Sequence, residues 1–141
     1  MALTSEATTV WTGTLFEGSG QVALDSSGLA TFDVNWKARS EGVANTTNPE
    51  EMLAAAHSSC FSMALSNGLA KAGTPPTTLD TTANVTFVPG TGITGIALSV
   101  VGEVPGMSAE DFQSAAEGAK EGCPVSKALA GTTITLDAAL A

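Results

Sequence analysis

The pattern of apolar and polar residues predicts several short strands at the start of the chain. Apolar and polar side chains alternate over residues 29–36, with the period of two that is typical of a half-buried strand. Two shorter stretches, 8–15 and 20–24, also resemble strands, and Gly18-Ser19-Gly20 separates them. A turn over 25–28 leads into the third stretch. We therefore expect an antiparallel meander in the first third of the chain.

The next segment carries strong signals for the start of a helix. Asn48 is a favourable cap, Pro49 suits the first helical position, and two glutamates follow in the first turn, where the helix dipole favours negative charge. We expect this helix to run to about Lys71 and to stop at Gly73. Because it carries few charges between its ends, it is apolar nearly all round, which is typical of a helix buried in the molecule or at an interface.

The rest of the chain predicts two longer strands, two helices and a final strand. These are expected at 80–88, 93–104, 108–120, the short segment after Cys123-Pro124, and 132–140. Ser108 followed by Asp111 resembles a capping box at the start of the first of these helices. Strands and helices in this order indicate an α+β fold. No repeat or linker is evident, so we expect a single domain, residues 1–141.

Composition narrows the possible partners. The net charge of -9 repels phosphate backbones and anionic lipid, which argues against nucleic acid and membrane surfaces. Only 13% of the 141 residues are charged and 43% are hydrophobic, so we expect a partner to cover part of the surface, most simply in a homodimer. With no signal peptide or apolar run of membrane-spanning length, the expected location is the cytoplasm.

Two cysteines are the main candidates for chemistry. Cys60 lies inside the predicted long helix beside several serines and three residues after His57, the single histidine. Cys123 precedes Pro124 and is expected to cap the short helix, whose unpaired N–H groups favour the thiolate. Cys60, in mid-helix, gains nothing comparable from the backbone.

Three interpretations of the cysteines remain open. A structural disulfide would close a loop of about 60 residues and contribute about 4 kcal/mol, but disulfides are rare in the cytoplasm. A metal site would use His57, Cys60 and Cys123, yet no fourth ligand is evident. A redox pair needs a nucleophilic thiolate, a resolving thiol and a nearby cation. Only the redox pair uses both thiols and Arg39, the single arginine, so we favour it.

The chain resembles the OsmC/Ohr family of thiol peroxidases, and is nearer to the OsmC branch. The resemblance rests on TNPEEML at 47–53, AAH at 55–57, CFSMAL at 60–65 and GCPVS at 122–126. It implies an intertwined homodimer in which antiparallel sheets pack on two long helices. It also implies reduction of organic hydroperoxides, and more weakly of hydrogen peroxide, with an external dithiol, such as a lipoyl-bearing protein, as reductant. No cofactor and no metal are expected.

The resemblance also assigns roles to individual residues. It makes Cys60 the attacking thiolate, Cys123 the resolving cysteine, and Arg39 with Glu50 the pair that activates Cys60. Glu50 and Cys60 lie ten positions apart, about 15 Å along one helix, so we expect Glu50 and Arg39 to serve the Cys60 of the other subunit. The alternative is a protein without catalytic activity that binds a small apolar or acyl ligand at the dimer interface.

Overall fold

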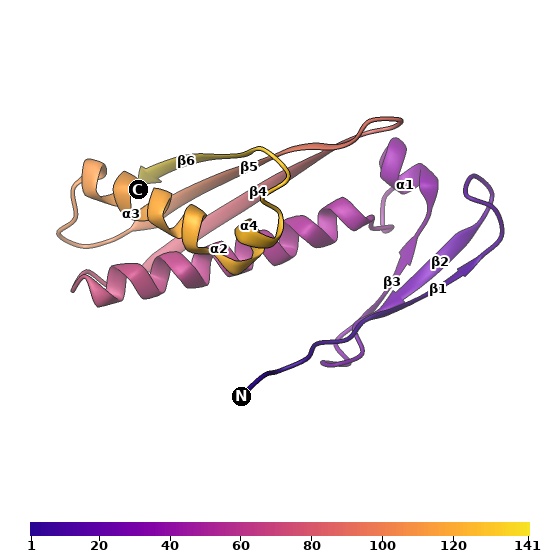
Figure 1. Ribbon diagram of the computed structural model, residues 1–141, viewed down its shortest axis with the longest axis horizontal. Helices are drawn as coiled ribbons and strands as arrows, with labels where there is room; N and C mark the ends of the chain where they lie inside the picture. Colours follow the sequence, from indigo (N-terminus) through magenta and orange to yellow (C-terminus); the bar gives the residue numbers. More distant parts are fainter. The chain divides into compact units, whose positions relative to one another are not determined.

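The computed structural model describes residues 1–141 and divides into two compact units, Met1–Met52 and Leu53–Ala141. Figure 1 shows the elements of both, and each unit is described by itself. The prediction of a single domain stays a prediction. No helix is both long and apolar enough to cross a membrane.

The first unit contains the predicted meander. Strands β1 (Thr8–Thr12), β2 (Ser19–Ala23) and β3 (Thr31–Val34) pair antiparallel in that order, which confirms the prediction. The third strand is shorter than expected, however, because the chain turns into helix α1 (Trp36–Ser40). The side chain of Asn35 caps this helix by accepting the N–H of Ala38 at 2.7 Å. Trp36 and Arg39 therefore lie on a helical turn that the alternation pattern did not predict.

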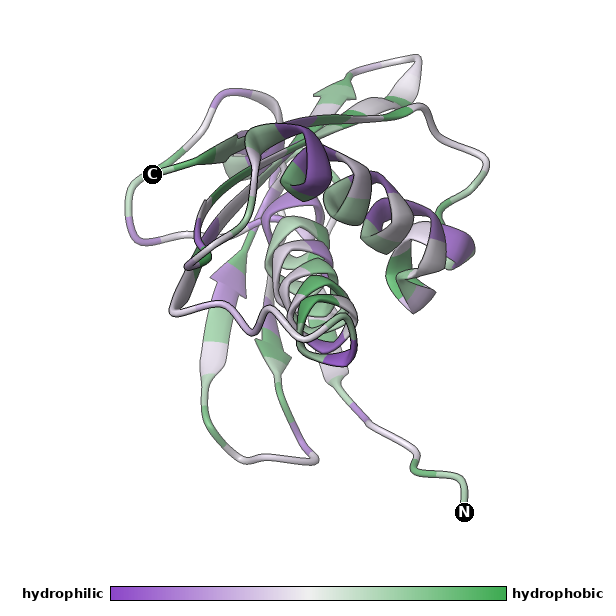
Figure 2. Ribbon diagram, turned by 90° about the vertical axis from the view of Figure 1, so that its left-hand side faces the viewer, coloured by the Kyte–Doolittle hydropathy of each residue, from purple (hydrophilic) through white to green (hydrophobic).

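Helix α2 spans Pro49–Lys71, as predicted. The Asn48 side chain accepts the N–H of Glu51 at 2.8 Å and so caps the first turn. The helix ends just before Gly73, which has a φ of +87°, a conformation that glycine adopts without strain. Figure 2, coloured by hydropathy, shows α2 nearly end-on and mostly pale or green, in agreement with its low content of charge.

The second unit contains a mixed three-stranded sheet. Strands β4 (Thr78–Val88) and β5 (Gly92–Glu103) form the predicted antiparallel pair, but β6 (Ile134–Leu140) runs parallel to β5. A parallel neighbour needs a long crossover connection. Helices α3 (Ala109–Gly122) and α4 (Pro124–Ala128) provide it between β5 and β6. The expectation of antiparallel sheets therefore needs correction at this one strand.

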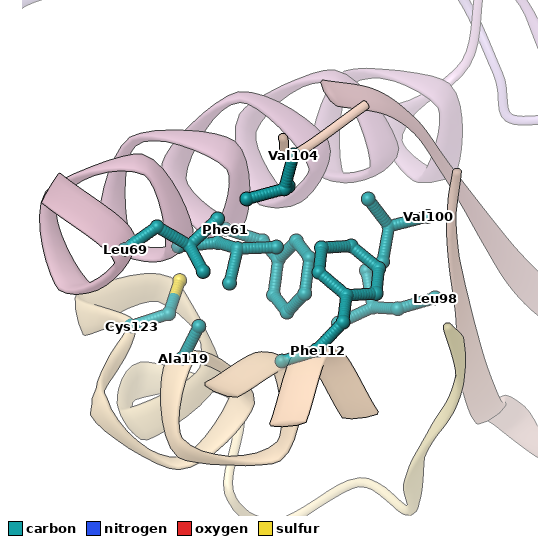
Figure 3. Packing of buried hydrophobic residues seen from close by; sticks show 10 residues of the cluster. Phe61, Leu69, Leu98, Val100, Val104, Phe112, Ala119 and Cys123 are labelled. Atoms are coloured by element: carbon teal, nitrogen blue, oxygen red, sulfur yellow. The ribbon is translucent and has the colours of Figure 1, made fainter. Parts of the chain in front are cut away.

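The core of the second unit lies between α2, α3 and β5 (Figure 3). Four buried positions of α2 recur every fourth residue and line one face of the helix: His57, Phe61, Leu65 and Leu69. Phe112 enters the same cluster from α3, and Cys123 joins it at the end of that helix. Packing of this apolar face thus holds Cys123 against α2.

Candidate active site

Helix α1 and the first turn of α2 bring Arg39 and Glu50 together. The Arg39 Nη2 atom donates to Glu50 Oε1 at 2.7 Å, and Nε donates to Oε1 and Oε2 at 3.0 and 3.2 Å. Such a fork of charge-assisted hydrogen bonds fixes both side chains. The side chain of Glu50 is only 6% exposed and that of Arg39 is 32% exposed. Glu51, the other glutamate in the first turn of α2, is exposed.

The two cysteines lie side by side although 63 positions separate them in the sequence. The Sγ atoms of Cys60 and Cys123 are 3.1 Å apart, and both thiols are free. Cys60 is half-buried on α2, whereas Cys123 is fully buried between α3 and α4. The two sulfurs are within hydrogen-bonding distance. Only a small movement of one toward the other is needed to form a disulfide bond.

The surroundings of the two thiols push their pKa values in opposite directions. Burial raises the pKa of Cys60, and its hydrogen bond with Cys123 raises it further, against a smaller lowering by the N–H of Val125. Burial also raises the pKa of Cys123, but hydrogen bonds from Cys60, Ser126 and Val125 together lower it below the ordinary value. Either thiol can donate in the contact between the sulfurs. These pKa directions favour Cys60 as the donor and Cys123 as the thiolate.

His57 contacts the same region from α2. Its Nε2 lies 2.7 Å from the hydroxyl oxygen of Ser126, and both residues are buried. The Nδ1 atom is also buried and has no hydrogen-bond partner. Burial lowers the pKa of His57, so the ring is neutral at pH 7. Ser126 was not among the site residues predicted from the sequence, although the spacing Cys-x-x-Ser places it three residues after a helix cap.

Comparison with known proteins adds to this geometry. The profile of the family described as "OsmC-like protein" matches residues 22–137. The chain is 45% identical over 130 residues to Peroxiredoxin OsmC of Escherichia coli K12, which covers 90% of each protein, and equally to that of Shigella flexneri. The chain belongs to the OsmC-like proteins. As in these relatives, the activity is that of a cysteine-based peroxidase.

Solved structures of OsmC-like proteins share the fold. An organic hydroperoxide resistance protein from Elizabethkingia anophelis matches with a TM-score of 0.70 and 29% identity, over 100% of this chain and 97% of that one. An organic hydroperoxide resistance protein OsmC from Legionella pneumophila matches with a TM-score of 0.72 and 21% identity, over 100% and 98%. The α+β OsmC fold is therefore shown.

The residues of this OsmC-like protein form two groups. Arg39 and Glu50 meet in the first unit, whereas in the second unit Cys60 meets Cys123 and His57 meets Ser126. No group of three or more histidine, cysteine, aspartate or glutamate side chains is arranged to hold a metal ion. The Nε2 atom of His57 faces a serine hydroxyl, so the alternative of a metal site gains no support.

A cavity in the first unit includes the arginine. Its volume is about 210 Å³ and its lining is mainly apolar. The lining residues are Thr9, Trp11, Leu15, Val22, Val34, Asn35, Trp36, Arg39, Pro49 and Met52. An apolar wall with one charged group suits a ligand that has an apolar body and a polar end.

Proposed function

We propose that this chain reduces organic hydroperoxides, and hydrogen peroxide more weakly, through Cys60 and Cys123. The observation that carries the proposal is the 3.1 Å separation of two free thiol sulfurs, one of them half-buried. A pair at this distance can close to a disulfide without refolding of the elements that hold it.

The reaction has three steps: reduction of the peroxide, formation of the disulfide and reduction of the disulfide. The Cys60 thiolate attacks the terminal peroxide oxygen, the O–O bond breaks, and the departing alkoxide takes up a proton to leave as alcohol. Cys60 is then a sulfenic acid. Cys123 attacks the sulfenic sulfur, a disulfide forms, and water leaves. An external dithiol, such as one on a lipoyl-bearing protein, reduces the disulfide and is itself oxidised.

Arg39, held by Glu50, provides the positive charge that the surroundings of Cys60 lack. Within one chain the thiolate is favoured on Cys123, so attack by Cys60 needs a cation that stabilises its thiolate and the negative charge developing on the peroxide oxygens. The guanidinium of Arg39 fills this role, and its hydrogen bonds with Glu50 hold it in a fixed orientation.

The apolar cavity next to Arg39 favours organic peroxides as substrates. Its lining offers little to a small polar molecule such as hydrogen peroxide, but it accommodates an alkyl or aryl group while the peroxide faces the guanidinium. The solved structure from Elizabethkingia anophelis, which is 29% identical, is named an organic hydroperoxide resistance protein, which fits this substrate class.

The proposed active form is a homodimer in the cytoplasm. The face of α2 opposite to its core residues exposes small and apolar side chains, namely Ala55, Ala56, Ser59 and Met63, and Met63 is 72% exposed. A second copy of the chain would cover this face. Because Glu50 and Cys60 are about 15 Å apart along α2, Arg39 and Glu50 of one subunit act on the Cys60 of the other.

Trapping experiments test the roles of the cysteines. One equivalent of cumene hydroperoxide is added to Cys123→Ser and Cys60→Ser variants in the presence of dimedone, which labels sulfenic acids. The Cys123→Ser variant should be labelled at position 60, because its sulfenic acid has no resolving thiol. The Cys60→Ser variant should remain unlabelled. Labelling of Cys123 alone would reverse the assigned roles.

Mixed dimers test whether the site is shared between subunits. A dimer of one Arg39→Met subunit and one Cys60→Ser subunit should regain about half of the activity, since the intact Arg39 of one chain meets the intact Cys60 of the other. The matched control carries both changes on one subunit beside an unmodified subunit, and it should be inactive. The reverse result would place the arginine and the cysteine of each site on the same chain.

A further inference from the structure

The contact between His57 and Ser126 lies next to the cysteine pair, but no step of the proposed reaction uses it. The Nε2 atom of His57 and the hydroxyl oxygen of Ser126 are 2.7 Å apart. His57 is 0% exposed and Ser126 is 5% exposed. Two polar side chains in an apolar core carry a desolvation cost that their mutual hydrogen bond offsets. Because Ser126 lies close to Cys123 in the chain, the pair can also affect the Cys123 thiol.

The tautomer of His57 follows from its second ring nitrogen. Nδ1 is sealed from solvent and has no hydrogen-bond partner. A buried N–H without an acceptor is among the least tolerated arrangements in a protein, whereas an unpaired acceptor is tolerated more often. Nδ1 is therefore the bare nitrogen of the neutral ring, and Nε2 carries the hydrogen and donates it to the Ser126 oxygen.

This direction leaves the hydroxyl hydrogen of Ser126 available for another acceptor. Cys123 is the N-cap residue of helix α4 and Ser126 is the third residue of that helix, so both side chains start within its first turn. The sulfur of Cys123 is the acceptor that lies within the same helical turn. In agreement, the Ser126 hydroxyl contributes to lowering the pKa of Cys123.

We propose that His57 and Ser126 are positioning residues for the resolving step: the Nε2–H of His57 holds the Ser126 hydroxyl so that it donates to the Cys123 thiolate. The inference rests on the proposed function of Cys123. In that step the thiolate attacks the sulfenic sulfur of Cys60, the S–S bond forms and the S–O bond breaks. The departing hydroxide takes up the proton that Cys123 had released, and water leaves.

Few other groups bear on the ionisation of Cys123. From α2, Cys60 lies next to it, and His57 contacts Ser126, three residues after it. Glu121 of α3 and Lys127 of α4, its charged neighbours in sequence, are both exposed, and solvent screens them. Cys123 itself belongs to the cluster of buried, mainly apolar residues from α2, α3 and β5. Its thiolate therefore depends on hydrogen bonds more than on nearby charge.

Nitrogen NMR of the unmodified protein tests the tautomer directly. Because the chain has a single histidine, uniform ¹⁵N labelling of the full-length protein gives one pair of imidazole signals. We expect a protonated Nε2 and a bare Nδ1 at pH 7 to 8. A ring with the hydrogen on Nδ1 would overturn the proposal, since Ser126 would then have to donate to His57.

Titration of Cys123 tests the role of the serine. In a Cys60→Ser background, thiolate absorbance at 240 nm reports Cys123 alone. Replacing Ser126 with Ala should raise this pKa by about one unit, the effect of one hydrogen bond to a charged group. His57→Met should raise it in the same direction, and His57→Gln, which keeps a donor, should restore most of the shift. An unchanged pKa in the Ser126→Ala variant would overturn the proposal.

The combination of both changes separates positioning from a general structural role. If His57 acts through Ser126, His57→Met should add no further shift once Ser126 is Ala; an equal shift in both backgrounds would overturn the proposal. With native Cys60, the Ser126→Ala variant should form the disulfide from the sulfenic acid about tenfold more slowly at pH 7 and recover at higher pH. If no sulfenic acid forms at Cys60, the proposed function is wrong. The NMR experiment and the titration still test whether His57 and Ser126 hold a hydrogen bond to Cys123.

Discussion

Replacing Arg39 with Met should destabilise the protein as well as inactivate it. The change leaves the Glu50 carboxylate, whose side chain is 6% exposed, without the three hydrogen bonds that the guanidinium donates. Removing one partner of a buried ion pair costs about 3 to 5 kcal/mol. Because the side chain of Arg39 is 32% exposed, water can reach the vacated space, and we expect a loss of about 3 kcal/mol, the lower end of that range.

Urea unfolding followed by circular dichroism at pH 7 measures this loss, at one protomer concentration for all variants. The double variant Arg39→Met/Glu50→Gln should recover about 1.5 kcal/mol, because no buried charge is left unpaired. Lys120→Met is the matched control: Lys120 pairs with Glu117 at 3.0 Å on the surface of α3, and its loss should cost less than about 1 kcal/mol.

Activity separates catalysis from stability in these variants. Both Arg39→Met and the double variant should remain folded but reduce cumene hydroperoxide orders of magnitude more slowly than the unmodified protein, because both lack the guanidinium at the reacting oxygens. Near-normal turnover in either variant would refute the catalytic role of Arg39. A stability of Arg39→Met equal to that of the Lys120→Met control would refute the argument from the buried carboxylate.

Three further changes have expected outcomes. Oxidation to the Cys60–Cys123 disulfide should raise the free energy of unfolding in urea by about 4 kcal/mol, since it closes a long loop; equal stability of both redox forms would contradict this. Gly102→Ala should lower the free energy of unfolding by about 1 to 3 kcal/mol, because the added Cβ would lie 2.5 Å from the ring of Phe112. Gly95→Ala on the same strand should be nearly neutral in the same assay, because the nearest atom to its added Cβ, the carbonyl oxygen of Thr133, is 3.7 Å away. Because the pKa of His57 is lowered from 6.5, the unfolded chain binds more protons below pH 6.5, so the free energy of unfolding should fall as the pH drops below this value; His57→Gln should lose that dependence.

Local sequence signals accounted for most of the fold. The cap at Asn48, the proline after it and Gly73 set the bounds of α2, and the caps act as expected. The alternation over 29–36 was misleading beyond Val34, because a capping hydrogen bond from Asn35 favours a helical turn over continuation of the strand. The parallel pairing of β6 depends on how α3 and α4 pack, which no local pattern encodes.

The candidate site was predictable in part. The choice of Glu50 as the partner of Arg39 came from the resemblance, and the ion pair agrees with it. The cap position of Cys123 indicated which thiol ionises more readily in one chain, and the pKa directions agree. The hydrogen bond between His57 and Ser126 joins residues 69 positions apart, so it forms only when α4 packs against α2 and cannot be predicted from local sequence.

Mass spectrometry after a single turnover shows whether Cys60 and Cys123 form a disulfide when peroxide is reduced. The reduced full-length protein is treated with one equivalent of cumene hydroperoxide, quenched with an alkylating agent and digested. We expect an intact mass lower by two hydrogens and a linked pair of peptides that contain Cys60 and Cys123. Two alkylated thiols with the peroxide unconsumed would contradict it.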